Sequence, residues 1–437
     1  MIIGLRRTIL ITYALLACIL PTVASAQEQD WNWHVQNTDV VQWHPRFPAR
    51  FSGPQSLSAT SEGRETVSVD LYGGVRLWEG AELHVDGLMW HGFGLSDTHG
   101  VAGFPSAEAF RIGTGLLKGT LARVFVRHTI GLGGEQETVE DDQLQLAGTR
   151  DVSRITLTLG KISVKDLFDG NAYANDPRTQ FLNWSLMANG AWDYPADTVG
   201  YTIGFAAELN RPLWAVRYGI FEVPKHLNGE AFDRHLLKAW SMVTEIERRY
   251  AVASHPGTVR LLAYVTRAHM GRYQDALNAP TRPADTTPFR RGYQSKFGVG
   301  LNMDQELIAG VGMFMRLGWS DGQTDSWMFT DVDRTASLGL SIKGRSWNRP
   351  DDTIGVGGAF NGLTGVHRKY LAAGGLGILA GDGTLSYSGE RLLEVYYDAD
   401  LWKGLHAALD YQFIVNPAYN RDRGPVSVFG MRVHWSY

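Results

Sequence analysis

The chain ends with Phe429-Gly430-Met431-Arg432-Val433-His434-Trp435-Ser436-Tyr437, in which every second residue is large and apolar. Glycine, arginine, histidine and serine occupy the positions between. Side chains of a β-strand alternate between its two faces, so this segment predicts a strand with one apolar and one polar face. Residues 67–78 and 391–401 repeat the same alternation.

Segments of this kind recur along the chain and predict an all-β fold of about 16 strands. The predicted strands cover residues 51–61, 67–78, 81–91, 120–130, 152–164, 200–209, 213–222, 240–250, 258–268, 295–304, 309–320, 334–345, 352–361, 391–401, 405–415 and 425–437. Short links alternate with long ones, which is typical of an outer-membrane barrel with periplasmic turns and external loops. Residues 131–151 depart from this rhythm, because they form a long link on the side expected to be short.

A closed barrel of this size has a lumen too wide for side chains to fill. We therefore expect a transmembrane antiparallel β-barrel with water inside and the apolar rows facing lipid. Aromatic residues at predicted strand ends would form the interfacial belts, namely Trp78, Trp90, Trp214, Trp319, Trp402, Trp435 and Tyr437. A two-sheet sandwich and a propeller are the alternatives built from similar strands.

The first 26 residues predict a signal peptide, because Arg6 and Arg7 precede an apolar stretch and Ala26 ends a small-x-small cleavage site. A lipoprotein site at Cys18 is the alternative, but the residues after it remain apolar. The predicted organisation is a signal peptide over residues 1–26, an N-terminal periplasmic segment over 27–50 and an outer-membrane barrel over 51–437. Cleavage near Ala26 removes the only cysteine, so we expect no disulfide in the mature chain.

Composition and motifs narrow the function classes. The chain has 41 Lys and Arg against 45 Asp and Glu, so it has no basic surplus and nucleic acid is not an expected partner. We find no zinc-helix motif, no phosphate-binding loop and no nucleophile elbow in a strand-turn-helix setting. An enzyme, a metal and a cofactor are therefore not expected, although a serine triad defined by geometry has no fixed spacing to find.

Residues 165–199 form the most unusual link, because a loop of this length and aromatic content is expected to pack against a surface. The available surface is the inner barrel wall, so we expect this third external loop to fold into the lumen and narrow it. Aromatic faces beside charged and amide groups also suit a sugar. The candidate pore-lining residues of this loop are Asp169, Asp176, Arg178, Phe181, Asn183, Trp184, Trp192 and Asp193. The alternative is that they only pin the loop to the wall, with Arg178 paired to Asp176 or Asp169.

Charged residues on the predicted inward rows extend the candidate site. Arg76, Arg123, Arg127 and Arg154 would line the pore from the barrel wall. Opposed rows of arginine and acid across a pore create a transverse field that orients polar solutes. The alternative for each position is a charge that is only hydrated or paired.

Six longer runs carry a further signal. They are GLGGE at 131–135, NDPRTQFLNW at 175–184, GAWDY at 190–194, HRKYLAAGGLG at 367–377, GDG at 381–383 and YQFIVNPAYNRDRGP at 411–425. Together they resemble the carbohydrate-selective porins of the OprB type from Gram-negative outer membranes.

This resemblance implies a 16-stranded porin of the cell outer membrane, usually a homotrimer embedded in outer-membrane lipid. It implies passive, carbohydrate-selective diffusion of small sugars such as glucose into the periplasm, without catalysis or cofactor. Two alternatives stay open: a general diffusion porin without sugar preference, and a barrel-scaffolded outer-membrane enzyme or adhesin.

Overall fold

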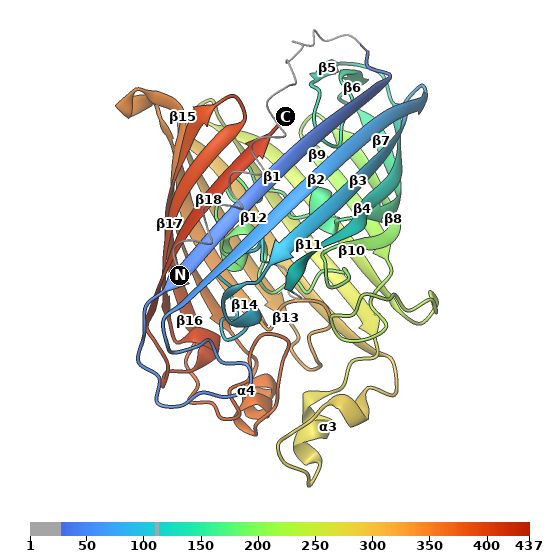
Figure 1. Ribbon diagram of the computed structural model, residues 1–437. Helices are drawn as coiled ribbons and strands as arrows, with labels where there is room; N and C mark the ends of the chain where they lie inside the picture. The colour runs from blue at the N-terminus through green and yellow to red at the C-terminus, as the bar shows by residue number, and fades with distance from the viewer. Residues whose placement is uncertain (1–27, 110–112) are drawn as a thin grey trace.

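A computed structural model of the protein describes residues 28–109 and 113–437. Sixteen antiparallel strands close into one barrel, which confirms the predicted all-β architecture (Figure 1). The barrel strands are β1 (Trp31–His44), β2 (Glu62–Trp78), β3 (Ala81–Gly92), β4 (Thr114–Gly131), β7 (Arg154–Ile162), β8 (Thr202–Arg211), β9 (Trp214–Phe221), β10 (Trp240–Val252), β11 (His255–Ala268), β12 (Gln294–Ile308), β13 (Val311–Ser320), β14 (Arg334–Gly344), β15 (Arg349–Gly362), β16 (Glu390–Trp402), β17 (Leu405–Val415) and β18 (Val426–Ser436). The predicted signal peptide, residues 1–26, lies outside the described residues.

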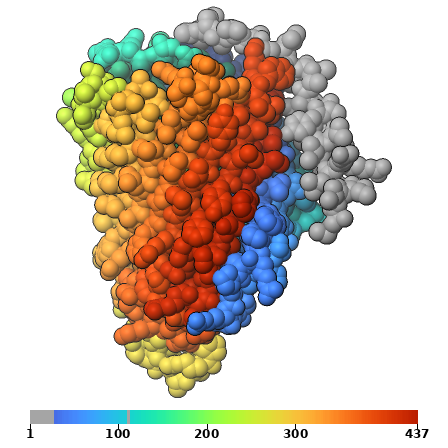
Figure 2. Space-filling view, turned by 90° about the vertical axis from the view of Figure 1, so that its left-hand side faces the viewer, coloured from blue at the N-terminus to red at the C-terminus, as the bar shows by residue number. Residues whose placement is uncertain are grey.

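The barrel closes where the last strand meets the first. β18 pairs antiparallel with β1, and Trp43 lies opposite Phe429. Figure 2 shows this seam from outside, with β1 in blue beside the final strands in red. In β18 the exposed Phe429 and Met431 alternate with the buried Arg432 and His434. The alternating segment at the end of the chain is therefore the closing strand, with its polar face turned inward.

The first strand lies earlier than the sequence pattern predicts. Residues 51–61 contain no strand, and β1 comes from the segment 27–50 that was expected to be periplasmic. Its pattern is obscured because Asn37 and Asp39 interrupt the outward apolar row, while Val40 interrupts the inward polar one. Both predictions, the strand over 51–61 and the periplasmic segment over 27–50, are wrong for this reason.

The two ends of the barrel differ in the length of their links. On one side, which we call the turn side, residues 79–80, 212–213, 253–254, 309–310 and 403–404 make tight turns. Gly80 and Gly310 adopt positive φ angles of 76° and 84° in two of these turns, a conformation that favours glycine. On the opposite loop side run the links 45–61, 93–113, 163–201, 222–239, 269–293, 321–333, 363–389 and 416–425. Short turns face the periplasm in outer-membrane barrels, which orients the molecule.

Helical segments occur only in links of the described chain. They are η1 (Leu95–Asp97), η2 (Val164–Asp166), α2 (Trp184–Met187), α3 (Tyr273–Asn278), η3 (Thr287–Phe289), η4 (Arg345–Trp347), α4 (Gly365–Ala372) and η5 (Pro417–Tyr419). Across residues 28–109 and 113–437, no helix is both long and apolar enough to span a membrane.

Aromatic side chains project from the outer wall near strand ends, as expected for interfacial belts. Trp78, Trp214, Trp319 and Trp402 are between 37% and 71% exposed. Trp90 is an exception, because it lies on the inward row of β3 and is 6% exposed within a cluster of inner-wall side chains. Its assignment to a belt is therefore wrong.

The loop 163–201 runs inside the barrel, against strands far from those that carry it. It leaves β7 and returns to β8, yet the Phe181 ring packs between Phe314 of β13 and Tyr396 of β16 at centroid distances of 5.1 and 5.0 Å. The Asn183 backbone N–H donates to Glu394 of β16 at 3.0 Å. The predicted inward fold of the third external loop is thus confirmed.

Wall glycines make room for this loop. A Cβ added at Gly312 would lie 2.0 Å from the ring of Tyr173, and one added at Gly318 would lie 2.0 Å from the Asn189 side chain. Real Cβ atoms do not approach other atoms this closely, so a larger residue at either position would force the Tyr173 or Asn189 side chain to move.

A buried ion pair fixes the loop to the wall. The Arg316 side chain, on β13, is fully buried; its Nε donates to Asp169 Oδ1 at 3.1 Å and its Nη1 to the Leu186 carbonyl at 2.8 Å. Burial alone would raise the pKa of Asp169, but Arg316 and Lys165 hold it well below its ordinary value of 3.8. The carboxylate therefore stabilises the fold above the ordinary pKa of aspartate, and this contribution is lost only as the pH falls through the lowered pKa.

Replacing Arg316 with leucine should release the loop and leave the barrel closed. Removing one member of a buried ion pair costs about 3–5 kcal/mol, whereas the hydrogen bonds between strands are untouched. Single-channel recordings of Arg316→Leu should show a larger and noisier conductance than the parent, with unchanged far-UV circular dichroism. Lys403→Leu removes an exposed positive charge in a turn and serves as the control. Parental conductance in Arg316→Leu would contradict the anchoring role.

Candidate functional site

Five candidate residues of the loop hold it in place. None of Asp169, Phe181, Asn183, Trp192 and Asp193 is more than 2% exposed, and none lines the cavities described below. The Asp193 carboxylate accepts the backbone N–H groups of residues 327, 328 and 329 at 2.6 to 3.1 Å, which ties the link 321–333 to the loop. For these five, the structure supports the alternative in which they pin the loop.

Arg178 joins the loop to the barrel wall and to a second link. Its Nη2 lies 3.4 Å from Asp70 of β2, and its Nε lies 3.3 Å from Glu108 of the link 93–113. We call these three residues the Arg178 bridge. Asp176 accepts the backbone N–H of Arg178 at 2.9 Å, so the expected side-chain pairing with Asp176 or Asp169 is replaced by these two acids. Burial raises the pKa of Glu108, and the Arg178 guanidinium opposes that rise.

Arg123 ties both ends of the loop to the wall. From β4 it donates to Asp86 of β3 at 2.6 Å and to Asp166 of η2 at 2.7 Å. Its guanidinium also lies over the ring of Tyr201, 5.1 Å from the centroid. The Arg123 side chain is 9% exposed. Its two carboxylate partners largely neutralise its charge within the wall and the loop.

An aromatic cavity lies on the loop side, where the links 93–113, 163–201, 321–333 and 363–389 meet. Trp184 lines it and stacks on Phe104, with ring centroids 5.1 Å apart and planes 18° apart. Tyr194 and Phe329 complete the aromatic lining. Trp184 is therefore the candidate aromatic residue of the loop that the structure places at a cavity.

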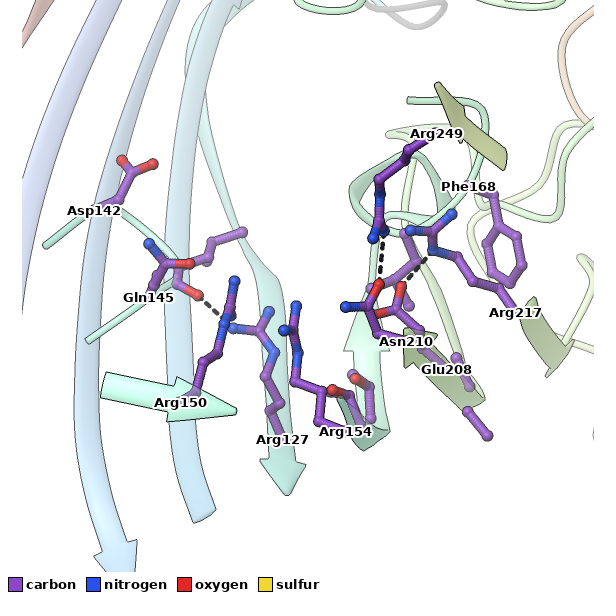
Figure 3. A pocket seen from close by; sticks show the side chains of 16 residues that line it. Arg127, Asp142, Gln145, Arg150, Arg154, Phe168, Glu208, Asn210, Arg217 and Arg249 are labelled. Carbon is purple, nitrogen blue, oxygen red and sulfur yellow. Dashed lines mark hydrogen bonds and ion pairs between the residues drawn. The ribbon is translucent and has the colours of Figure 1, made fainter. Parts of the chain in front are cut away.

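A larger cavity, which we call the inner chamber, lies between the loop and the wall strands β4 and β7 to β10 (Figure 3). Its volume of about 370 Å³ falls within the range of small-molecule pockets. The chamber contains Arg127 and Arg154 from the candidate set. Its charged lining residues are Arg127, Asp142, Arg150, Arg154, Glu208, Arg217 and Arg249.

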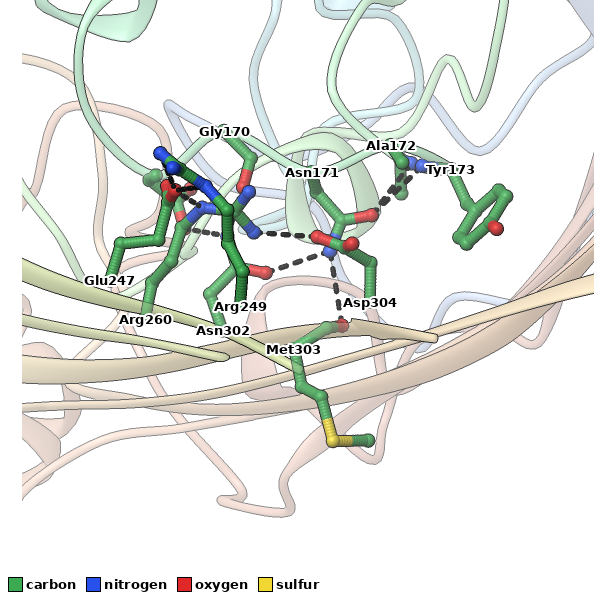
Figure 4. A network of polar contacts seen from close by, with 12 residues as sticks. Gly170, Asn171, Ala172, Tyr173, Glu247, Arg249, Arg260, Asn302, Met303 and Asp304 are labelled. Atoms are coloured by element: carbon green, nitrogen blue, oxygen red, sulfur yellow. Dashed lines mark hydrogen bonds and ion pairs between the residues drawn. The ribbon is translucent and has the colours of Figure 1, made fainter. Parts of the chain in front are cut away.

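Charges alternate from strand to strand along one side of the lumen. Arg217 of β9 donates to Glu245 and Glu247 of β10, both at 2.9 Å. Arg260 of β11 donates to Glu247 at 3.0 Å and pairs with Asp304 of β12 (Figure 4). These charges are therefore paired along the wall. The expected transverse field would instead require them to face one another across the pore.

The irregular link 132–153 also turns into the lumen, from the turn side. It contains a separate hairpin of β5 (Gln136–Val139) and β6 (Gly148–Asp151). Asn32 of β1 donates to Asp141 at 2.7 Å, and Gln143 donates to Gln36 at 2.8 Å. Arg76 lines a cavity of about 530 Å³ at this mouth. The sequence pattern did not predict that this link folds into the lumen. Its unusual length on the turn side was the only indication.

Sequence reasoning also missed the acids of the Arg178 bridge. Asp70 belongs to an inward row of a predicted strand, and Glu108 to a loop without a recognisable pattern. In the described part of the chain, no group of three or more His, Cys, Asp or Glu residues is placed to hold a metal ion.

Comparison with solved structures finds one that supports this architecture and others of lower similarity. OprB of Pseudomonas putida is 18% identical, covers 93% of this chain and 94% of its own, and has a TM-score of 0.70, a likeness that supports the fold. OccAB1 of Acinetobacter baumannii has a TM-score of 0.48 at 11% identity and covers 94% and 97% of the two chains. For OccK2 of Pseudomonas aeruginosa the TM-score is 0.47 at 10% identity, with 93% and 97% covered.

Comparison of the sequence with known proteins and with family models identifies the family of the chain. A search of curated proteins gave no match. The family model described as carbohydrate-selective porin, OprB family, matches residues 55–437, which is most of the chain. The protein therefore belongs to the OprB family of carbohydrate-selective porins and is an outer-membrane channel, not an enzyme.

Proposed function

We propose that this channel lets small sugars such as glucose diffuse passively into the periplasm. The observation that carries the proposal is the combination of flat aromatic faces and charged groups around one inward loop. Trp184 and Phe104 lie on the loop side, and the Arg178 bridge joins the loop to β2 and to the link 93–113. A sugar ring has apolar C–H patches surrounded by hydroxyl groups, so stacking faces and hydrogen-bonding groups match both parts of its surface.

The route begins at the aromatic cavity, passes the Arg178 bridge and ends in the inner chamber. At the bridge, Arg178 offers hydrogen-bond donors, and Asp70 and Glu108 offer acceptors, which is the complement of a hydroxyl group. In the chamber, Arg127 and Arg154 line the wall. Conduction requires each contact to be weak enough to release the solute, and the sugar leaves down its gradient without covalent chemistry.

Replacing Trp184 with leucine should weaken sugar binding, because leucine fills space but has no flat aromatic face. Aromatic contacts of this kind contribute about 0.5–1.5 kcal/mol, so the glucose concentration that halves the conductance should rise about 2- to 10-fold. The measurement is planar-bilayer conductance during a glucose titration, with Arg178→Gln as the second variant. Trp402→Leu is the control, because it makes the same substitution at an exposed position on the outer wall, away from the loop.

Unchanged glucose kinetics in both Trp184→Leu and Arg178→Gln would exclude this constriction as the sugar site. A parent channel whose conductance ignores glucose would favour a general diffusion porin without sugar preference.

We also propose that the channel is a homotrimer in outer-membrane lipid, as the family resemblance implies. Asp39 lies on the outward row of β1, where a charged side chain is costly against lipid. A subunit interface over β1 would cover it. Native mass spectrometry of the detergent-purified protein should give three times the chain mass, and Asp39→Arg should lower it. A parent protein that remains monomeric would contradict this part of the proposal.

A further inference from the structure

Three arginines converge at one side of the inner chamber. Arg127 comes from β4, Arg154 from β7 and Arg150 from β6 of the inward hairpin. Figure 3 shows their side chains next to one another, with the guanidinium groups at similar height. The site exists only because the link 132–153 folds into the lumen and brings Arg150 to the two wall arginines.

These three guanidinium groups have few acidic partners among the described residues. Arg150 and Arg154 share one carboxylate, that of Glu137, at 2.7 and 3.0 Å. Arg127 donates to the Leu144 carbonyl at 2.8 Å, and its ion pair with Glu82 spans 3.9 Å. Glu82 is itself hydrogen-bonded to the ring of a wall histidine. Three positive charges thus face one close carboxylate.

On the opposite side of the chamber, the arginines are paired with nearby carboxylates. Arg217 contacts three carboxylates, and Arg249 pairs with Glu247 at 2.7 Å and donates to Asn210 at 2.6 Å. These arginines are neutralised by the wall, as structural charges usually are. The chamber therefore carries its excess positive charge at Arg127, Arg150 and Arg154.

The three arginines also keep donors available to a solute. Their side chains are 19%, 33% and 10% exposed for Arg127, Arg150 and Arg154, and each uses a single nitrogen in its hydrogen bonds with the described residues. A guanidinium fork has five N–H donors in a geometry that fits carboxylate and phosphate. Like charges held together without an anion repel one another, and an oxyanion between them relieves that repulsion.

We propose that Arg127, Arg150 and Arg154 form a binding site for the oxyanion group of a small solute, such as a sugar acid or a sugar phosphate. The shared chemistry is a carboxylate or phosphate that accepts hydrogen bonds from two or more guanidinium forks. The site lies beyond the Arg178 bridge, towards the turn side, so an anionic sugar that has crossed the constriction meets it before it leaves. This inference rests on the proposed function only in that small solutes must reach the chamber.

The test is a conductance titration in planar bilayers at about 0.1 M salt, where charges within about 10 Å are not fully screened. The added solutes are glucose, gluconate, glucose 6-phosphate and inorganic phosphate. The parent should be blocked saturably by gluconate or by the phosphate compounds at concentrations at least tenfold lower than by glucose. Arg150→Gln should raise the blocking concentration of the anions about tenfold and leave that of glucose unchanged. Arg150→Lys keeps the charge but loses the fork, and should have an intermediate effect.

Arg249→Gln is the matched control, because it removes one positive charge from the same chamber at a position paired with Glu247. It should change the anion block by less than about twofold. An equal effect of Arg249→Gln and Arg150→Gln would mean a diffuse field and would overturn the local site, as would parent channels that bind the anions no better than glucose. Binding of inorganic phosphate with no binding of the sugar derivatives would overturn the solute class.

A parent channel with no response to glucose would contradict the sugar channel. A parent channel with a normal glucose response but no arginine-dependent anion block would contradict only the oxyanion site.

Discussion

Sixteen strands can close only around a space that their own side chains do not fill, and the inward segments of this protein depend on that constraint. The inner wall is polar because it faces water, so a loop that enters the lumen must be held by hydrogen bonds and ion pairs. The Arg316 and Asp169 pair, with Phe181 seated between two wall rings, provides this hold for the loop 163–201. The loop and its anchor determine where the remaining passage runs.

The loop contacts strands from β9 round to β18, and the inner chamber remains between it and the wall strands β4 and β7 to β10. The Arg178 bridge lies at β2 and the link 93–113. A second inward segment, the link 132–153, narrows the lumen from the turn side. The channel is thus shaped from both ends, and each end presents a different chemistry: aromatic faces on the loop side and guanidinium groups on the turn side.

The sequence was sufficient to predict the barrel because most strands alternate cleanly, as β18 does. It failed at β1, where Asn37 and Asp39 interrupt the outward row, and at Trp90, whose belt assignment ignored that its strand turns it inward. The inward fold of the aromatic loop was predictable from its composition. Its anchors could not be separated from the residues that line a cavity, because Trp184 and Trp192 look alike in sequence and only packing distinguishes them.

The partners of Arg178 were also out of reach, because Asp70 and Glu108 are distant from it in sequence and meet it only where the loop 163–201 and the link 93–113 fold inward. Arg150 was missed for the same reason: its neighbours Arg127 and Arg154 lie on other elements. Patterns along a strand predict which face a residue occupies, whereas contacts across the lumen depend on the register and on loops that fold inward.

A cysteine pair tests most directly whether the loop 163–201 stays against the wall strands inside the barrel. A Cβ on Gly190 of the loop would lie 3.5 Å from the Cβ of Thr335 on β14, a separation that suits a disulfide. The only native cysteine is Cys18, within the predicted signal peptide, so the background is clean. Gly190→Cys with Thr335→Cys should cross-link on folding, with the same conductance oxidised and reduced. Failure to cross-link, or a channel that closes on oxidation, would place the loop elsewhere and contradict the account.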